Sequence, residues 1–461
     1  NLFLTTIDKS YKYNTIINGN QNGSCINIEN STDTIVINGF TVRNGRGRDG
    51  GGIRVFESVC NTLNCIVTNN NSWKSGGGIS VTFDSYSKLS NNSIFNNHAY
   101  GSGGGVFVAV DSEIEFDSTS RNNLYYNNAE RGCDFTKTES AVTSVIFLDT
   151  CTVENPIPYF FIAIDESGNT IDELEYSINF HKIVPYDGNI YVNPNLGNNN
   201  NSGTSWDDPL KSIAWAYSKI HVDSINPNTI YLANGIYSDT TNDEKFPFNI
   251  RLFVNIEGQS RDNVILDGNR NIYILKGNNK ITDYSIKKMT LQGGPFPDYN
   301  NPWGIPATLA HLYWNNHRFI LDSILFKDSF AFEAYGILTY GFADSSIVRN
   351  CEFIYNMGGR TLRTAIGKSS PRKSQPDSDK DEYGEKQYIS NTKFIRQKGD
   401  PNDDGNNALV LVSQFQGTDY VQNCLFQDND NTAIIKASMG GNAYLTNCTF
   451  VNNSELEDRP A

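Results

Sequence analysis

A four-residue pattern of polar and apolar positions recurs along the chain. Its clearest copies read Asn, Cys, any residue, large apolar residue, and they begin at Asn64, Asn350, Asn423 and Asn447. Strand positions two residues apart face the same side, so the Cys and the apolar residue point together into a core. Several copies end in Asn-Asn, and Asn suits tight corners because it tolerates positive φ. One short strand and one corner, repeated many times, are typical of a solenoid.

The second position of this pattern is small in most copies. It is occupied by Cys65, Cys351, Cys424 and Cys448, and in degenerate copies by Ser93 and Thr392. A buried thiol behaves as a small hydrophobic group, so we interpret these four cysteines as free thiols in the core. The sequence leaves the disulfide state of the other four open; these are Cys25, Cys60, Cys133 and Cys151.

Residues 1–135 also carry a longer repeat. Gly triplets begin at Gly50, Gly76 and Gly103, at steps of 26 and 27 residues (76 − 50 and 103 − 76), and a short alternating strand follows each triplet. Each repeat therefore holds at least two short strands with turn signals and no helical period. Hairpins would alternate the strand direction. A chain that coils in one sense instead stacks the equivalent strands of successive repeats on one another, about 4.8 Å apart. We predict that residues 1–135 are the C-terminal part of a first parallel β-helix.

Residues 190–461 restart the same architecture with a visible beginning. Asp208 is predicted as the N-cap of a short helix, and Leu210 and Tyr217 lie on its apolar face. A solenoid must cover its open end, so we predict that this amphipathic helix caps a second parallel β-helix. The intervening residues 136–189 break the pattern and are predicted to form a β-rich connector.

The two halves of the chain are copies of one module. Residues 14–20 (Asn-Thr-Ile-Ile-Asn-Gly-Asn) match residues 263–269 (Asn-Val-Ile-Leu-Asp-Gly-Asn) at an offset of 249 (263 − 14). The first copy lacks a counterpart of residues 190–249, and the second reaches Ala461 without a closing segment. We therefore expect further modules of the same longer chain as neighbours of this one.

The second copy is less regular than the first. The large apolar positions of its motif are spaced 27, 41, 32 and 24 residues apart; they are Phe326, Phe353, Phe394, Phe426 and Phe450. The excess spacing indicates loop insertions at about 360–387 and 397–407, and a third irregular stretch spans residues 293–318. Long loops on a rigid coil are where binding or chemistry usually occurs.

The composition and net charge of the chain disfavour some classes of binding partner. The chain has 38% hydrophobic and 19% charged residues and a net charge of −14, with no basic stripe visible in the sequence. This disfavours nucleic acid and anionic membranes as partners. The longest apolar run, residues 159–164, is far too short to span a bilayer, so we expect no membrane insertion in this segment.

The repeats and the opening of the second copy resemble a known family. Residues 191–194 (Tyr-Val-Asn-Pro), 203–209 (Gly-Thr-Ser-Trp-Asp-Asp-Pro) and 229–235 (Thr-Ile-Tyr-Leu-Ala-Asn-Gly) are similar to the pectate-lyase-like right-handed parallel β-helices, especially the secreted and surface members of bacteria. The resemblance implies an all-β fold of tandem right-handed coils and an extracellular or cell-surface location. It implies no single activity, because the family mixes lyases, hydrolases, epimerases and adhesins. Its lyases carry a basic proton abstractor beside carboxylates that hold calcium, and no matching motif occurs in this chain.

Two acidic stretches in the insertions are candidate calcium loops. The first contains Asp377, Asp379 and Asp381 at alternate positions, and the second contains Asp400, Asp403 and Asp404. Carboxylates at such spacing are the oxygen ligands that Ca²⁺ prefers, although neither loop has the closing Glu of an EF-hand. The alternative is a solvated acidic loop without a metal.

Basic and aromatic residues of the loops are the other candidates. Arg360, Arg363, Lys368 and Arg372 cluster beside the first acidic loop, where a base could remove a proton α to a carboxylate. Trp303, Tyr313 and Trp314 could form a stacking platform for sugar rings. The alternatives are a charged surface loop and an aromatic cover for the side of the coil.

These observations favour an extracellular tandem β-helix that is non-catalytic: a surface scaffold, an adhesin or a glycan-binding module. Its partner is then a polysaccharide or a cell-surface glycan, and calcium is the candidate ion. The alternative is a polysaccharide lyase or glycoside hydrolase with its site on the second β-helix.

Overall fold

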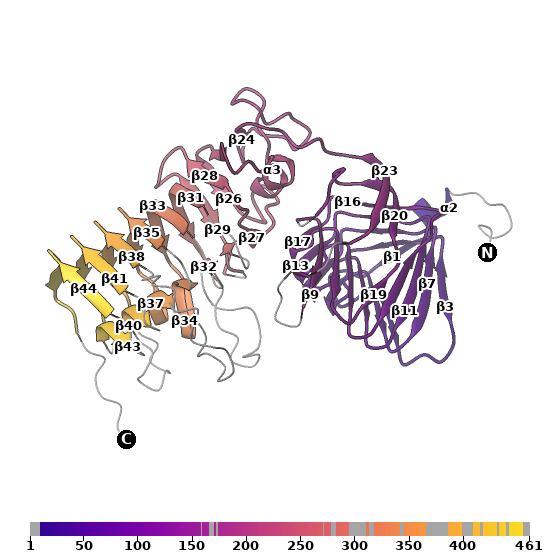
Figure 1. Ribbon diagram of the computed structural model, residues 1–461, viewed down its shortest axis with the longest axis horizontal. Coiled ribbons are helices and arrows are strands. Elements are labelled where there is room, and N and C mark those ends of the chain that lie inside the picture. The colour runs from indigo at the N-terminus through magenta and orange to yellow at the C-terminus, as the bar shows by residue number, and fades with distance from the viewer. Residues whose placement is uncertain are drawn as a thin grey trace, which may run out of the picture. The chain divides into compact units, whose positions relative to one another are not determined.

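The computed structural model describes most of the chain in two compact units (Figure 1). The described residues are 10–157, 159–165, 170–171, 174–270, 272–277, 283–294, 310–312, 318–341, 345–365, 386–398, 409–414, 418–430, 433–438 and 442–454. Unit 1 spans Asn1–Pro185 and unit 2 spans Tyr186–Ala461.

Unit 1 is a coil whose strands form four sheets, preceded by the short helix α2 (Tyr11–Asn14). The first sheet has the order β1 (Ile16–Asn18), β4 (Thr41–Arg43), β8 (Ile66–Thr68), β12 (Ser93–Phe95), β16 (Asn122–Tyr125), β20 (Ile146–Cys151), β23 (Tyr176–His181). The second has the order β2 (Ile26–Glu29), β6 (Ile53–Phe56), β10 (Ile79–Thr82), β14 (Val106–Ala109), β18 (Phe135–Thr138), β21 (Phe161–Ile164), β22 (Thr170–Ile171). The third is β19 (Val142–Thr143), β15 (Glu113–Phe116), β11 (Tyr86–Ser90), β7 (Val59–Leu63), β3 (Ile35–Asn38), and the fourth is β17 (Asn128–Arg131), β13 (His98–Ser102), β9 (Asn71–Ser75), β5 (Arg46–Asp49).

Unit 2 repeats this plan with two sheets. The long sheet follows β24 (Ile190–Val192), β25 (Asn228–Leu232), β28 (Val254–Gly258), β31 (Tyr284–Gln292), β33 (Arg318–Lys327), β35 (Ser345–Arg349), β38 (Lys386–Ser390), β41 (Thr418–Gln422), β44 (Asn442–Thr446). Strands β26 (Gly235–Tyr237), β29 (Val264–Asp267), β36 (Glu352–Ile354), β39 (Lys393–Ile395), β42 (Leu425–Gln427) and β45 (Thr449–Val451) belong to the same sheet. The other sheet is β27 (Phe248–Asn249), β30 (Leu275–Lys276), β32 (Ala310–Leu312), β34 (Phe330–Gly341), β37 (Met357–Ala365), β40 (Leu409–Gln414), β43 (Ala433–Ser438).

The predicted tandem right-handed parallel β-helices are confirmed. Strands of successive turns pair in parallel, as in Ile53 with Ile79 and Ile79 with Val106, so each turn lies on the equivalent turn before it. The offset of 249 between the two copies also survives in the pairing. Ile16 pairs with Thr41 in unit 1, and Ile265 pairs with Thr290 in unit 2.

The segment predicted as a connector contains strands that pair with the first coil. Strand β20 pairs in parallel with β16, β23 pairs with β20, and β21 pairs with β18. The parallel ladder of unit 1 therefore continues to His181, a few residues before the second unit begins.

The capping helix is present but begins later than Asp208. Helix α3 (Ile213–Lys219) has Ser212 as its N-cap, and the Ser212 hydroxyl accepts from the Trp215 amide. Asp208 instead accepts from the Ser202 amide at 2.8 Å, and Leu210 forms a bridge to strand β24, which holds this segment extended. The buried Glu244 carboxylate accepts from the amides of Ile213 and Ala214, the free donors of the first helical turn.

Inside unit 1, one Asn from each of three Asn-Asn corners contributes to a continuous hydrogen-bonded column. The Asn70 side chain donates to Asn97 Oδ1 at 3.0 Å, and Asn97 donates to Asn127 Oδ1 at 3.0 Å. Each of these amides also donates to a carbonyl of the preceding turn, as Asn97 does to Val67 at 2.9 Å. The column ends at Asp134, whose carboxylate accepts from Asn127 at 2.9 Å and from the Thr152 hydroxyl at 2.6 Å.

Unit 2 combines a similar column with a stack of phenylalanines. The ring centroids of Phe326, Phe353, Phe394, Phe426 and Phe450 are 4.5, 5.0, 4.9 and 4.8 Å apart in sequence order, with nearly parallel planes. Beside them Asn356, Gln397, Asn429 and Asn453 each donate to the carbonyl of a ladder phenylalanine one turn earlier. The motif thus fills the interior of the coil, as its spacing predicted.

All eight cysteines are free thiols. Cys65, Cys351 and Cys424 are buried at the predicted position of the motif, with Cys448 half-buried. Thr392 occupies the same position, but Ser93 does not, because β12 pairs Ser93 with Ile66 and so places Asn92 in the turn position of Cys65. The degenerate copy is therefore shifted by one residue from the sequence alignment.

Burial makes Asp134 a pH-sensitive end to the asparagine column. Burial raises the pKa of its carboxyl from 3.8 to about 7, despite the hydrogen bonds from Thr152 and Asn127. A raised pKa means that the folded state binds the proton more tightly than the unfolded state, so this stabilisation is complete below about pH 4 and is lost as the pH rises through about 7. We expect the free energy of unfolding, measured by chemical denaturation, to fall by roughly 1 to 4 kcal/mol between about pH 5 and about pH 8.5.

The variant Asp134→Asn is the matched control. Its Oδ1 can accept from Asn127 as before, and its amide can donate to the Thr152 hydroxyl oxygen. It should lose most of this pH dependence and exceed the wild type in stability at about pH 8.5. Identical slopes in the two proteins would contradict the assignment.

The phenylalanine stack is expected to contribute to the free energy of unfolding. Phe394→Ala removes a fully buried ring that stacks on Phe353 and Phe426, and should lower the free energy of unfolding by about 3 to 5 kcal/mol. The exposed neighbour Lys393 points away from the core, so Lys393→Ala should change it by less than about 0.5 kcal/mol. Equal effects of the two substitutions would show that the stack does not stabilise the coil.

Candidate functional site

The outer face of the long sheet of unit 2 carries one continuous column of apolar and aromatic side chains. Strand pairing aligns Ile320 with Ile347, Ile347 with Tyr388, Tyr388 with Tyr420, and Tyr420 with Tyr444. Each lies six residues before a ladder phenylalanine (326 − 320, 353 − 347, 394 − 388, 426 − 420 and 450 − 444). We call these five residues the outer column.

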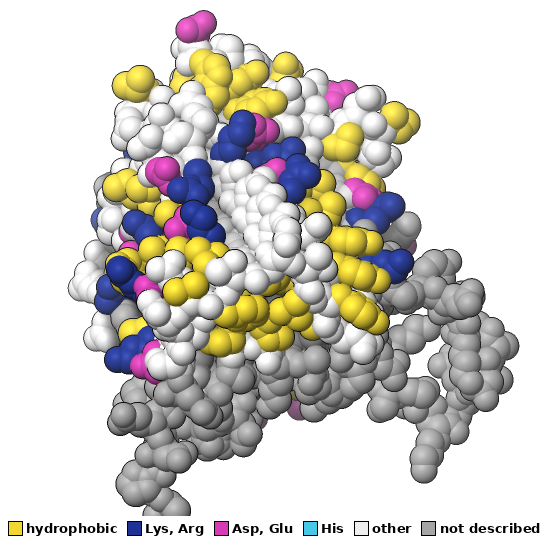
Figure 2. All heavy atoms as spheres, turned by 90° about the vertical axis from the view of Figure 1, so that its left-hand side faces the viewer, with side chains coloured by type: hydrophobic (Ala, Val, Ile, Leu, Met, Phe, Trp, Pro, Cys, Tyr) yellow, Lys and Arg dark blue, Asp and Glu magenta, His cyan; other side chains and the backbone are white. Residues whose placement is uncertain are grey.

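The tyrosines of the outer column stack upon one another along the coil. The ring centroids of Tyr388 and Tyr420 are 5.4 Å apart, and those of Tyr420 and Tyr444 are 5.5 Å apart, with planes within 17°. Tyr388 is 42% exposed and Tyr444 is 57% exposed. Because each ring covers a face of the next, ring edges and phenolic hydroxyls form the surface that a ligand meets. Figure 2 faces this end of unit 2 and shows hydrophobic, Lys and Arg side chains close together on its surface.

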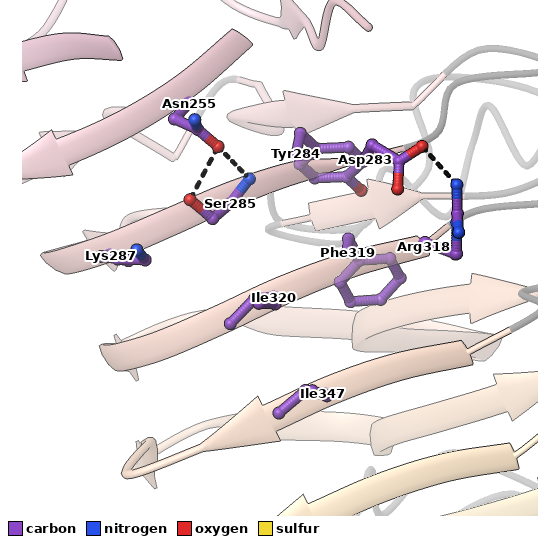
Figure 3. A pocket seen from close by; sticks show the side chains of 9 residues that line it. All are labelled: Asn255, Asp283, Tyr284, Ser285, Lys287, Arg318, Phe319, Ile320 and Ile347. Carbon is purple, nitrogen blue, oxygen red and sulfur yellow. Dashed lines mark hydrogen bonds and ion pairs between the residues drawn. The ribbon is translucent and has the colours of Figure 1, made fainter. Parts of the chain in front are cut away.

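A pocket of about 310 Å³ lies at the other end of the outer column (Figure 3). Ile320 and Ile347 supply an aliphatic wall, and Ser285 lies next to Ile320 on strand β31. The other lining residues come from strands β28, β31 and β33 and the turn before β31; they are Asn255, Asp283, Tyr284, Lys287, Arg318 and Phe319. The pocket and the tyrosines thus share one face of one sheet.

The polar groups of the pocket are held at fixed positions. Asn255 Oδ1 accepts from the Ser285 amide and from the Ser285 hydroxyl, both at 2.8 Å. At the strand ends, Arg318 and Asp283 form an ion pair of 2.7 Å. Lys287 forms no ion pair with any residue that the structure describes.

A column of charged residues runs beside the outer column. Strand pairing aligns Glu257, Lys287, Asp322 and Arg349 in that order. Lys288 approaches Glu257 to 2.7 Å, and the hydrogen bond raises the pKa of Lys288. Burial of Asp322 opposes ionisation, but hydrogen bonds from Asn350, Arg349 and Ser323 outweigh it and lower the pKa of this carboxyl. An ionised, paired Asp322 is suited to accepting hydrogen bonds rather than to donating a proton.

The same face carries an aromatic cluster near the capping helix. Tyr191 and Tyr231 are adjacent in register and stack at 5.4 Å, and the Trp206 ring meets Tyr191 edge-on at 4.9 Å. Tyr231 is aligned with Glu257, so this cluster continues into the charged column. Aromatic surface is therefore present at both ends of the face, with the pocket between.

The residues singled out in the sequence fall mostly outside the described part of the chain. This holds for Trp303, Tyr313 and Trp314, for Lys368 and Arg372, and for the acidic residues Asp377, Asp379, Asp381, Asp400, Asp403 and Asp404. The backbone of Arg360 pairs with Gly336 and Leu409, and that of Arg363 pairs with Thr339 and Val412, which places both in strand β37 rather than in a loop. Their side chains lie outside the description.

The described residues contain neither a metal-binding cluster nor a helix that could cross a membrane. Across these ranges there is no group of three or more His, Cys, Asp or Glu side chains that could hold a metal ion. The helices described are also too short and too polar to cross a membrane. The calcium prediction thus still rests on the two acidic stretches of the insertions.

Comparison with known proteins adds a family match and two distant likenesses. A family described as a protein of unknown function (DUF1565) matches residues 195–301, and no curated protein matches the chain. Among solved structures, the chain is similar to the pectin methylesterase PemA from Erwinia chrysanthemi at 11% identity and a TM-score of 0.29, over 59% of this chain and 91% of that one. It is also similar to a mutant of the PL6 family alginate lyase AlyGC at 13% identity and a TM-score of 0.31, over 92% of this chain and 68% of that one. The class that the strand pairing defines is the parallel β-helix.

Proposed function

We propose that this chain is an extracellular, non-catalytic polysaccharide-binding β-helix, and that unit 2 binds an extended glycan along the outer face of its long sheet. The outer column is the observation that carries this proposal. It offers Ile320, Ile347, Tyr388, Tyr420 and Tyr444 in one line on a rigid support. A sugar ring has apolar C–H faces and polar hydroxyls, and a line of aliphatic groups, ring edges and phenols matches both.

The shape of the face favours a polymer over a small molecule. Neighbouring strands lie about 4.8 Å apart, so the steps from Ile320 to Tyr444 span roughly 20 Å along the coil. The pocket at one end supplies the hydrogen-bonding groups of Ser285 and Asn255 and the ammonium of Lys287. Such groups fix orientation and specificity, while the apolar line supplies contact area.

A second candidate function is cleavage of the bound glycan by β-elimination. Lys287 lines the pocket and lies in register between Glu257 and Asp322. A basic group is therefore placed between two carboxylates. If it acts as the base, neutral-pH incubation with a uronic-acid polysaccharide, with and without calcium, yields unsaturated ends that Lys287→Ala abolishes. A polysaccharide that the protein binds but leaves intact supports the non-catalytic proposal.

The outer column can be tested by affinity electrophoresis against a panel of neutral and uronic-acid polysaccharides. Each stacking tyrosine should contribute about 1 kcal/mol, or about a fivefold change in Kd. The triple variant Tyr388→Ala, Tyr420→Ala, Tyr444→Ala should therefore lower the affinity for the bound polysaccharide by about 100-fold.

A matched triple variant controls for the loss of exposed tyrosines in general. Tyr13, Tyr186 and Tyr355 are exposed outside the outer column, and their replacement by Ala should leave binding unchanged within about twofold. If both triple variants bind as the wild type does, the outer column is not the glycan site.

A further inference from the structure

A basic and aromatic patch lies on the outer face of unit 1, on strands β5 and β9. It consists of Arg46, Arg48, Trp73 and Lys74, which we call the β5–β9 patch. The Arg46 guanidinium lies 5.2 Å from the centre of the Trp73 ring. The Trp73 side chain is nevertheless 53% exposed, which is unusual for the largest apolar side chain in a chain with a well-filled core.

A β-bulge presents these side chains together. Gly47 pairs with Ser72 and Asp49 pairs with Ser75, so one residue of β5, Arg48, faces two residues of β9, Trp73 and Lys74. The Ser72 hydroxyl donates to the Arg48 carbonyl at 2.6 Å, or to the Ser75 carbonyl at 2.8 Å, and ties the bulge to both strands. Consecutive residues of a regular strand would face opposite sides, whereas here both Trp73 and Lys74 are exposed.

The cations of the patch are poorly matched by protein anions. The Arg48 side chain is 80% exposed and meets Asp49 only at 3.9 Å. Arg46 and Lys74 form no ion pair with any residue in the described ranges. The Asp49 carboxylate interacts electrostatically with Lys74 and Arg48, and it lies mostly below the surface with a side-chain exposure of 23%. Three cations thus share a small area of a chain whose net charge is −14.

We propose that the β5–β9 patch is a separate binding site for an acidic polysaccharide. Arg46, Arg48 and Lys74 contact carboxylate or sulfate groups of the ligand, and a sugar ring packs on the face of Trp73 away from Arg46. Guanidinium groups pair with such oxyanions through two parallel hydrogen bonds, and an anion relieves the repulsion among the three cations. The site lies in unit 1 and does not depend on the glycan site proposed for unit 2.

The small size of the patch favours an acidic glycan over nucleic acid. Proteins that bind single-stranded nucleic acid combine a long positively charged groove with several aromatic rings on which successive bases stack, whereas the patch has three cations and the single ring of Trp73. A sugar that carries a carboxylate or sulfate needs only one such ring and the cations beside it. Single-stranded DNA is therefore the competing ligand in the test.

The test measures binding of the whole chain to polygalacturonate, dextran sulfate, unsubstituted dextran and single-stranded DNA at low salt. The wild type should bind polygalacturonate or dextran sulfate, and binding should weaken at least about tenfold between about 0.05 M and about 0.5 M salt. The variant Arg46→Gln, Arg48→Gln, Lys74→Gln should weaken this binding by about tenfold for each cation that contacts the ligand. Trp73→Ala should weaken it, and Trp73→Phe should restore most of it.

Two further variants separate a site from a general effect of charge. Lys386→Gln, Lys393→Gln, Lys398→Gln removes the same number of exposed cations from unit 2 and should leave binding unchanged within about twofold. Asp49→Asn removes a carboxylate that interacts with Arg48 and Lys74 and should strengthen binding, a gain that a folding defect cannot imitate.

Each remaining outcome overturns the proposal. It fails if neither acidic polysaccharide binds, if both triple cation variants weaken binding equally, or if DNA binds more tightly than both polysaccharides. The tyrosine triple variant of unit 2 should leave patch binding intact, so failure of one site is distinguishable from failure of the other.

Discussion

The rest of the structure depends on the stacking of equivalent residues in successive turns. A coil of this kind buries its corners. The backbone carbonyls of a buried corner cannot reach water, so they need hydrogen-bond donors from the protein. The asparagine column supplies them: Asn97 donates to the Val67 carbonyl of one turn and to the Asn127 side chain of the next. The phenylalanine stack does the same for apolar volume, with Phe394 between Phe353 and Phe426. A single Asn or a single Phe would not stabilise the coil in this way, because each one interacts with the same residue type one turn away.

The same register produces the outer column. Whatever occupies an outward position in one turn lies directly beside the equivalent position of the next, so similar side chains make a line rather than a scatter. The outer column is such a line, and the charged residues from Glu257 to Arg349 are another. A β-bulge is the one device that breaks this rule, and it places Trp73 and Lys74 on the same side. The outer column and the β5–β9 patch are therefore both consequences of one backbone geometry.

The interior of the coil could be predicted from the sequence, because an inward position tolerates few residue types and therefore repeats visibly. Asn423 to Phe426 and its copies specify both the corner and the stack. Errors arose where the repeat degenerates: Ser93 was placed one residue out of register, and the helix was placed at Asp208 although a bridge at Leu210 keeps that segment extended. The outer column was missed for a related reason. Its positions hold different residue types, such as Ile320 and Tyr388, so no repeat is visible in the sequence. Only the constant distance of six residues to a ladder phenylalanine could have predicted the column.

Net charge describes the local electrostatics of this chain less well than the position of each charge. A total of −14 describes the potential at long range, but at physiological salt a charge acts over only about 8 Å. The β5–β9 patch has the opposite balance, because it combines Arg46, Arg48 and Lys74 with the partly buried Asp49. The sequence places Arg46 and Lys74 almost thirty residues apart, roughly one turn of the coil, and only the pairing of β5 with β9 brings them together. In a solenoid, local charge is therefore a property of adjacent turns, and it has to be assessed turn by turn.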